Sequence, residues 1–265
     1  MHRKREALFL PRSPLVFVLG AVQFDPVLAV EGYIPEIHES LRKKGFPKVR
    51  TRIIPHRIVK TEDSKLLAEV KKQWEFHDAA NRTSILVDQD AVVVQTTAYS
   101  TYEHLHELFE LALTAVADRL EVNEVLRCGL RYIDIVDCPP DGSIADWVQP
   151  ELLGMAGFGG FRRQLGHSTT ELASPDGSTV RIRASLLQEG IILPPDLLPC
   201  ELGFTKTPVR NEPFVMLDFD HFSPISHPYD RQATLDHLSM LHDGVDSAFR
   251  SSVTPHALEQ WKQQP

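Results

Sequence analysis

The residues best suited to do chemistry lie near the end of the chain, where acidic and histidine side chains follow one another. Asp218 and Asp220 are two positions apart in an apolar segment, 214–220, that predicts a strand. Alternate residues of a strand project from the same face, so the two carboxylates would lie roughly 7 Å apart. With His221 or His227 beside them, they form a ligand set for a hard or borderline metal ion. Metal-assisted hydrolysis is therefore one predicted function.

A simpler interpretation of the same residues is the solvated face of a terminal strand. The sequence contains no HExxH and no DxDxDG motif. His104 and His106 fall in a predicted helix, where residues two apart do not face each other, and His237 and His242 are five apart. These spacings favour surface histidines over a metal centre.

Arg131 and Tyr132 are candidates for binding a ligand or a partner. They lie in a mostly apolar predicted strand, 130–136, where a buried arginine needs a carboxylate or a ligand anion. Asp134 shares a strand face with Tyr132, whereas Arg131 shares its face with Ile133. A carboxylate for Arg131 must therefore come from another element. A structural ion pair is favoured, and ligand binding remains the alternative.

Arg181 and Arg183 share one face of a predicted hairpin strand and are candidates for the same role. Together with Arg162 and Arg163 they would form a cationic strip across the hairpin, although a solvated surface is the favoured interpretation. Weak nucleic-acid binding through this strip is a third predicted function. The net charge of −8 and the pI near 5.8 argue against a broad nucleic-acid surface.

The remaining motifs predict no cofactor and no nucleophile. The glycines at 154–160 match neither GxGxxG nor a phosphate-binding loop, and no GxSxG elbow is present. Cys128, Cys138 and Cys200 are far apart, which is typical of reduced thiols in a cytoplasmic protein, and Cys128 is expected in the core. Prolines interrupt the apolar N-terminal run, so the sequence predicts no membrane segment.

The elements that would position these residues are organised around the stretch 72–137. β-Branched runs joined by Asp88-Gln89-Asp90 predict an antiparallel hairpin, and Ser100 with Glu103 predicts a capping box that begins an amphipathic helix. The predicted elements of this stretch are strands at 72–76, 83–87, 91–97 and 126–137 and a helix at 102–120. Outside it, strands are predicted at 15–24, 49–58 and 214–220, a hairpin at 161–187, and helices near 33–41, 144–155, 232–249 and 254–262. The structure of 61–71 stays undecided, and 188–213 is predicted to be a long loop of the kind that forms lids or partner contacts.

Both halves of the chain repeat the same order of elements. A first half, 14–120, and a second half, 126–250, each end with a strand that leads into a long amphipathic helix, and 251–265 adds a terminal helix. The sequence predicts an α+β fold: one domain, 1–265, of two similar halves forming a curved antiparallel sheet with long helices on one face, as in helix-grip or saddle-like folds. The other sheet face, or the groove between sheet and helix, is the predicted binding surface.

The residues of this framework resemble those of a sporadically distributed bacterial family that is described as uncharacterised. The similar residues are Trp74 and Phe76, the hairpin leading to Tyr99, residues 102–109, the segment GLRYIDIVD from Gly129, Pro14-Leu15 with Val22-Gln23-Phe24, and 241–249 with Thr254. The resemblance implies the fold and no catalytic residues. The family's patchy occurrence resembles that of genes in defence or toxin–antitoxin loci.

The function favoured by these observations is that of a non-enzymatic cytosolic binding or regulatory protein. It is predicted to recognise a protein partner or a small ligand through the sheet face and the 188–213 loop. The sequence leaves homo-oligomer formation open.

Overall fold

The computed structural model describes residues 10–60, 66–137, 143–205 and 209–263. The chain folds as an α+β protein built on a large antiparallel sheet, as predicted. In the described residues, nine strands form this sheet in the order β2-β3-β4-β5-β1-β6-β13-β10-β9, and every neighbouring pair is antiparallel. The strands of the sheet are β1 (Leu15–Phe24), β2 (Lys48–Lys60), β3 (Leu66–His77), β4 (Thr83–Val87), β5 (Ala91–Thr96), β6 (Glu124–Asp137), β9 (Gly166–Ala173), β10 (Thr179–Leu187) and β13 (Phe214–Pro228).

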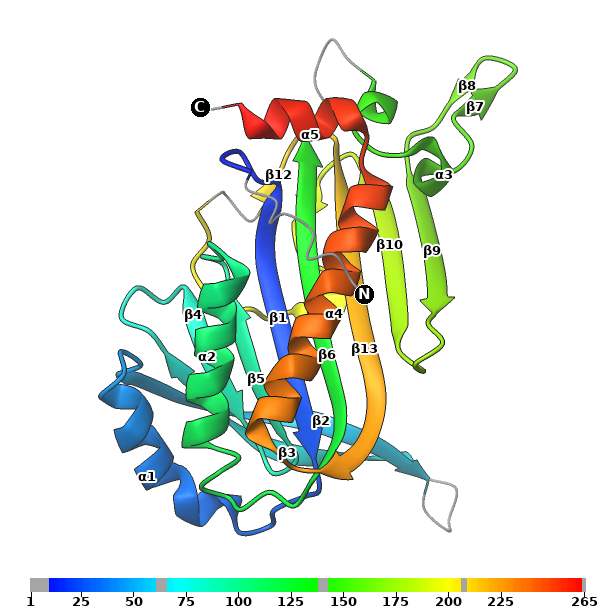
Figure 1. The fold of residues 1–265 in the computed structure, drawn as a ribbon. Coiled ribbons are helices and arrows are strands. Elements are labelled where there is room, and N and C mark those ends of the chain that lie inside the picture. The colour runs from blue at the N-terminus through cyan, green and yellow to red at the C-terminus, as the bar shows by residue number, and fades with distance from the viewer. Residues whose placement is uncertain (1–9, 61–65, 138–142, 206–208, 264–265) are drawn as a thin grey trace.

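Helices cover one face of this sheet (Figure 1). The helices are α1 (Val30–Arg42), α2 (Tyr102–Ala115), α3 (Pro150–Leu153), α4 (Arg231–Ser252) and α5 (Pro255–Lys262), with short 3-10 turns η1 (Ile144–Asp146) and η2 (Pro195–Leu197). Four two-residue strands pair outside the sheet, β7 (Gly157–Phe158) with β8 (Phe161–Arg162) and β11 (Gly190–Ile191) with β12 (Val209–Arg210).

The two long helices pack on the sheet through regularly spaced apolar residues. Leu105 and Phe109 of α2, and Leu238 and Leu241 of α4, are almost fully buried against it. This three- and four-residue spacing places one apolar stripe of each helix toward the sheet. Burial of each such side chain stabilises the docking by about 1.5–3 kcal/mol before conformational entropy is counted.

The strand order places β1 and β6, the first strand of each half, side by side in the middle of the sheet. The later strands of the first half follow outward as β5, β4, β3 and β2, and those of the second half follow as β13, β10 and β9. Each half thus contributes its strands to one wing of the sheet. The helices α2 and α4 follow the strands β5 and β13, which flank the central pair.

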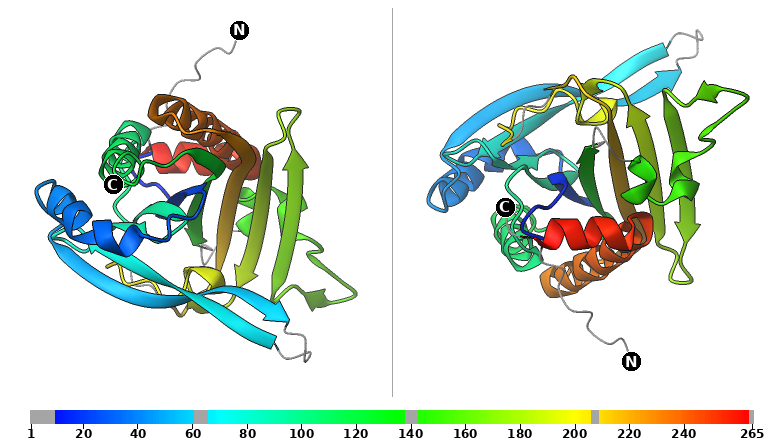
Figure 2. Two further views of the ribbon diagram at one scale, coloured as in Figure 1. Left: turned by 90° about the horizontal axis from the view of Figure 1, so that it is seen from below. Right: turned by 90° about the horizontal axis from the view of Figure 1, so that it is seen from above.

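The face of the sheet opposite the helices is not open. Figure 2 shows that the sheet bends and that the segment 190–205 lies on this outer face, inside the bend. A second apolar cluster joins this segment to the sheet, formed by Val16, Phe17, Ile133, Ile135, Phe214 and Met216 of the strands with Ile192, Leu193 and Leu202 of the segment. We call the part of this segment from Gly190 to Leu198 the roof. The predicted binding face is therefore partly covered by the chain itself.

Several predicted boundaries differ from the structure for local reasons. The N-cap of α2 is Thr101, whose side chain accepts from the His104 amide, so the predicted Ser100 capping box is wrong. Helix α2 ends at Ala115, and its continuation to residue 120 is a series of turns that closes with Glu121 at φ 50°. The predicted helix at 144–155 is split into η1 and α3, because Pro150 begins a new helix at its first position.

The strand predicted at 214–220 begins at the correct residue, but β13 continues beyond the predicted end to Pro228. Residues 66–71 of the undecided segment belong to β3, whereas 61–65, like Cys138, lie outside the described residues. The strands predicted at 15–24 and 83–87 are confirmed at both ends. Cys128 is fully buried as predicted, and burial raises the pKa of its thiol to about 12.

The packing of α2 on the sheet predicts a specific effect at Gly20 of β1. A Cβ atom at Gly20 would lie 2.2 Å from Phe109 Cζ and 2.6 Å from Leu130 Cδ2. Gly20→Ala should therefore lower the free energy of unfolding by about 1–3 kcal/mol through overpacking. Urea denaturation measures this change.

Gly32 in α1 is the matched control, because a Cβ there meets nothing within 4 Å. Gly32→Ala should stabilise the protein by up to about 1 kcal/mol through higher helix propensity. Equal stability changes at the two glycines would contradict the described contact between α2 and β1.

Candidate functional site

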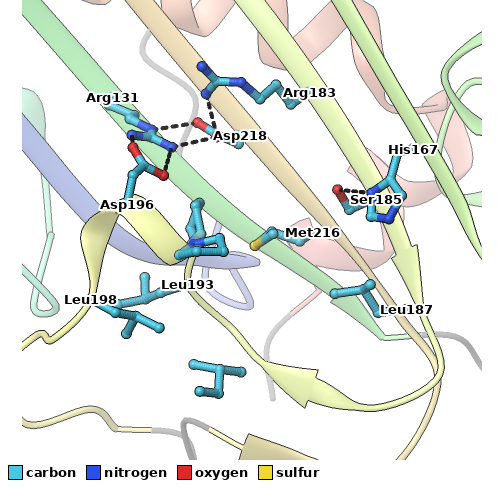
Figure 3. Close-up of a pocket in the computed structure, with 13 residues that line it drawn as sticks. Arg131, His167, Arg183, Ser185, Leu187, Leu193, Asp196, Leu198, Met216 and Asp218 are labelled. Carbon is cyan, nitrogen blue, oxygen red and sulfur yellow. Dashed lines mark hydrogen bonds and ion pairs between the residues drawn. The ribbon is translucent and has the colours of Figure 1, made fainter. Parts of the chain in front are cut away.

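A cavity of about 550 Å³ lies between the outer face of the sheet and the roof. Its wall is formed by Arg131, His167, Arg183, Ser185, Leu187, Met216 and Asp218 of the sheet and by Ile191, Leu193, Pro194, Pro195, Asp196 and Leu198 of the roof. Figure 3 shows the charged side chains together at one end and Leu187, Leu193 and Leu198 toward the other. The cavity is therefore amphipathic.

Strand alternation sets the sheet side of this cavity. Arg183, Ser185 and Leu187 of β10 project outward, while the intervening Ala184 and Leu186 are buried on the helix side. The same period places Met216 and Asp218 of β13 on the outer face and Val215, Leu217 and Phe219 on the helix side. The floor of the cavity is thus formed by the outer face of four adjacent antiparallel strands, β6, β13, β10 and β9.

The roof is held by backbone pairing at one end and by polar contacts beyond its other end. The two-residue strand β11 pairs with β12, and Gly190 takes a φ of 142° at the start of that pairing. After Leu198 the chain is tied to the first half of the sheet. These ties are Arg52 Nη1 to Pro199 O at 3.1 Å, Asn81 Nδ2 to Glu201 O at 2.6 Å, Thr97 Oγ1 to Gly203 O at 2.6 Å, and the ion pair of Arg50 with Glu201.

Arg131 is the centre of the charged end. Its Nε and Nη2 donate to Asp218 Oδ1 and Oδ2, both at 2.8 Å. Its Nη1 and Nη2 donate to Asp196 Oδ2 and Oδ1 at 2.5 and 3.1 Å. Arg183 Nη1 adds a bond to Asp218 Oδ2 at 2.7 Å. The carboxylates for Arg131 thus come from another strand and from the roof, as predicted for a structural ion pair.

The electrostatics of this cluster follow from these bonds. Burial opposes the charge of Arg131, but the hydrogen bonds to Asp218 and Asp196 outweigh it and raise the pKa of the guanidinium. The hydrogen bonds from Arg131 lower the pKa of Asp196. The cluster thus brings two guanidinium groups and two carboxylates together in a partly buried position. Such a network is stable only while every member keeps a partner.

His167 and Ser185 form a polar pair on the side wall of the cavity. His167 Nδ1 and Ser185 Oγ lie 3.0 Å apart, and the two residues are directly opposite each other in the β9–β10 register. Hydrogen bonds between directly opposed polar side chains are ordinary in antiparallel sheets. This pair supplies a hydroxyl and an imidazole that a polar group of a ligand can contact.

The structure separates Tyr132 from the other predicted binding residues. Its side chain lies on the helix side, where its hydroxyl is 3.1 Å from His242 Nδ1 and its ring packs edge-on against Tyr99. His242 in turn stacks on Tyr102 with ring centroids 4.0 Å apart. Tyr132 is a core aromatic between the sheet and the long helices, and it does not line the cavity.

Arg181 and Asp220 share the outer face with the cavity residues but lie outside its wall. Arg181 donates to Glu171 Oε1 at 2.5 Å and to Asp220 Oδ2 at 3.4 Å, and its guanidinium is 5.4 Å from the Phe222 ring centroid. Burial raises the pKa of Asp220, and the charge of Arg131 opposes this effect. Of the predicted solvated strip, Arg181 and Arg183 are paired with carboxylates. Arg163 instead donates to the carbonyl oxygens of Leu153 and Gly154, and Arg162 lies in β8, outside the large sheet.

His221 and His227 do not join Asp218 and Asp220. His221 is buried on the helix side, where its Nδ1 donates to Leu241 O at 2.8 Å and its Nε2 is 3.1 Å from Ser178 Oγ. His227 Nδ1 donates to Pro228 O at 2.8 Å. The predicted ligand set of these four residues is therefore not assembled. Across the ranges that the structure describes, no three His, Cys, Asp or Glu side chains are grouped so that they could hold a metal ion.

Comparison with known proteins assigns the chain to no family. No protein-family model matches the chain, and no curated protein has a significantly similar sequence. The resemblance to a sporadically distributed bacterial family stays a prediction. Among the described residues, no helix has the length and apolar character needed to cross a membrane.

Sequence reasoning missed Asp196, His167, Ser185 and the leucines of the roof. Ser185 and Met216 could have been predicted from the sequence, because they alternate with core residues in the same strands as Arg183 and Asp218. Asp196 had no such signal. It lies in the proline-rich sequence Leu193-Pro194-Pro195-Asp196, 65 positions from Arg131, in a segment without periodicity.

The structure predicts that removing the carboxylate of Asp218 destabilises the fold much more than removing that of Asp220, two residues further along β13. Asp218→Ala leaves Arg131 and Arg183 without their shared buried partner and should lower the free energy of unfolding by about 3–5 kcal/mol. Asp220→Ala, the matched change two residues on, removes a longer and more exposed contact with Arg181 and should cost under about 1 kcal/mol. Denaturant titration compares the two, and similar losses would show that Asp218 does not anchor the cluster.

Asp134 predicts a pH dependence of stability. Burial on the helix side of β6 raises the pKa of this carboxyl to about 8. Between the ordinary pKa near 4 and this value, the unfolded chain loses the proton that the folded chain keeps. Stability from this group is therefore present at acidic pH and is lost as pH rises toward 8. Asp134→Asn should gain stability over the wild type by up to about 1.4 kcal/mol per pH unit in that range.

Thermal unfolding of both proteins at pH 5 to 8 measures this difference. Asp25→Asn is the control variant, because it makes the same substitution at an exposed position. A constant difference between Asp134→Asn and the wild type across this range would contradict a buried protonated carboxyl at position 134.

Proposed function

We propose that this protein is a non-enzymatic binding protein that holds one small molecule in the cavity between the outer sheet face and the roof. The ligand carries one anionic group and an apolar body. The observation that supports this most strongly is the division of the cavity into an end with Arg131 and Arg183 and an end of leucine side chains.

The charged end favours an anion because arginine presents paired donors to planar or tetrahedral anionic groups. Arg131 lies on β6 with only 10% of its side chain exposed, and it lines the cavity beside the roof. A pre-positioned guanidinium loses little side-chain freedom on binding. We therefore expect Arg131 to bind an anion more strongly than a surface arginine does, provided that the anion takes the place of one of its carboxylate partners.

The size of the cavity favours a small molecule. Its volume of about 550 Å³ is within the range of roughly 300–1,000 Å³ that is typical of sites for small ligands. Apolar side chains of both the sheet and the roof would contact the ligand body, and each buried CH₂ group contributes about 0.8 kcal/mol. The carboxylates paired with Arg131, Arg181 and Arg183 neutralise the outer face, which does not favour nucleic acid.

Binding is preferred to metal-assisted hydrolysis because the carboxylates of the outer face already have cationic partners. Asp218 accepts hydrogen bonds from both Arg131 and Arg183, and Asp220 pairs with Arg181. A metal ion at these carboxylates would have to displace the arginines and leave them without partners.

We also propose that the two halves of the chain are duplicated units and that the protein is bacterial and cytoplasmic. The repeated order of elements in the two wings of the sheet supports a duplicated strand–helix–strands–helix unit and a saddle-like shape. Composition and the family resemblance support a bacterial cytoplasmic protein, with a link to a defence or toxin–antitoxin locus. A regulatory role fits a ligand that contacts the roof, because the roof surface can then report occupancy to a protein partner.

Calorimetric titration with octanoate tests the proposed function. Octanoate has about ten non-hydrogen atoms, and at roughly 0.4 kcal/mol for each the Kd should be about 1 mM or lower. Leu187→Trp fills the apolar end without touching the ion cluster, and it should weaken binding at least about tenfold through steric exclusion.

Leu172→Trp is the control, since Leu172 is 55% exposed on β9 and does not line the cavity. This variant should bind octanoate as the wild type does. The proposal fails if octanoate does not bind, or if the two tryptophan variants bind it equally well.

A further inference from the structure

The two edges of the Arg131 guanidinium are occupied by unequal partners. The edge formed by Nε and Nη2 is taken by Asp218, whose side chain is 3% exposed and fixed on β13. The edge formed by Nη1 and Nη2 is taken by Asp196 of the roof, whose side chain is 63% exposed. The first partner is part of the sheet, whereas the second is a solvated carboxylate at the cavity.

Charge balance shows which partner a ligand can replace. Arg131 and Arg183 carry two positive charges, and Asp218 and Asp196 carry two negative charges. An anionic ligand added to this cluster would leave it with a net negative charge in a partly buried site, which is costly. A ligand that replaces Asp196 keeps the cluster neutral and returns the Asp196 carboxylate to water.

The geometry of the Asp196 contact also indicates the class of anion. Its two carboxylate oxygens meet two separate nitrogens of one guanidinium edge, at 2.5 and 3.1 Å. This two-point contact is the arrangement that a planar carboxylate makes with arginine. Asp196 thus occupies the position that a ligand carboxylate would take.

We propose that Asp196 is an internal placeholder, and that a ligand carboxylate takes its position on Arg131 when it binds. This inference rests on the proposed function and names both the ligand class and the regulation of the site. The ligand is an amphipathic monocarboxylate. The empty site is kept closed by the Asp196 contact, so ligand binding and roof closure through Asp196 are mutually exclusive.

The anchors on either side of Asp196 limit the change that follows. The β11–β12 pairing lies before it, and the contacts of Arg52 with Pro199 and of Arg50 with Glu201 lie after it. Only the η2 turn between these anchors is released when Asp196 leaves Arg131. Occupancy therefore alters a short surface that includes the 40% exposed Leu198.

The affinity of the Asp196→Asn variant for octanoate tests this exchange. The variant removes the competing charge at an exposed position, so the protein no longer has to break an ion pair before it binds. It should bind octanoate about tenfold more tightly than the wild type in calorimetric titrations at low salt. Octanamide, which has the same alkyl chain and no charge, should bind both proteins with equal affinity.

Glu201→Gln is the matched control on the same segment. Glu201 pairs with Arg50 on the anchored side of the roof and does not line the cavity, so this variant should keep the wild-type affinity for octanoate. A gain equal to that of Asp196→Asn would overturn the inference by showing that loosening of the segment, not removal of the placeholder, raises the affinity.

The remaining outcomes separate the inference from the proposed function. If octanoate binds the wild type and Asp196→Asn equally, the placeholder is overturned and the binding function stands. If Asp196→Asn gains as much for octanamide as for octanoate, exchange of carboxylates is overturned in the same way. If neither protein binds octanoate, both proposals fail.

Discussion

The structure around the cavity depends on the guanidinium of Arg131, which is held between the sheet and the roof. A buried charge of this kind is stable only with hydrogen-bonded counter-charges, and Arg131 has one on each edge. Asp218 links β6 to β13 across the sheet, and Asp196 links β6 to the roof. One side chain thus connects the floor and the cover of the cavity, and it determines where the polar end of the site lies.

The period of two residues in a strand gives the sheet two surfaces of different character. On the helix side, Leu130 and Val136 of β6, Leu217 and Phe219 of β13 and Ala184 and Leu186 of β10 belong to one continuous core with α2 and α4. On the outer side, the same strands place Arg131, Asp218 and Arg183 beside Met216 and Leu187. The helices stabilise the fold from one surface, which leaves the other surface for polar groups and a cavity.

The roof completes this arrangement. Ile192 and Leu193 of the roof, with Leu202 after it, cover apolar residues of the central strands that would otherwise be exposed. The cover is incomplete over β10 and β13, where the cavity remains. This combination of an apolar cover, an ion pair and an unfilled space is what we propose to be the binding site. The placeholder role of Asp196 explains how such a site remains neutral when it is empty.

Much of the framework could be predicted from the sequence, because strands and amphipathic helices leave a local periodic signal. The apolar and β-branched runs of β1 and β4, the alternation of apolar residues in β10 and the helical spacing in α2 and α4 are visible within a few residues. The need of Arg131 for a carboxylate from another element was also predictable, since its neighbours on the same strand face, Gly129 and Ile133, carry none.

The candidate site itself was only partly predictable, because it is formed by contacts between distant segments. Arg131 is 87 positions from Asp218 and 65 from Asp196, and the roof has no periodicity that indicates where it packs. The grouping of His221 with Asp218 and Asp220 was wrong for a simple reason. An odd separation along a strand places His221 on the opposite face, where it contacts α4.

The most direct test of the central claim is the position of a bound monocarboxylate in a crystal structure. Crystals grown with 8-bromooctanoate would give anomalous scattering from bromine, which locates the alkyl end without bias. The account predicts a bromine peak among Leu187, Leu193 and Leu198, a carboxylate on the Nη1 and Nη2 edge of Arg131, and Asp196 turned away from it. A carboxylate bound elsewhere, or a cavity without bromine while Asp196 stays on Arg131, would contradict it.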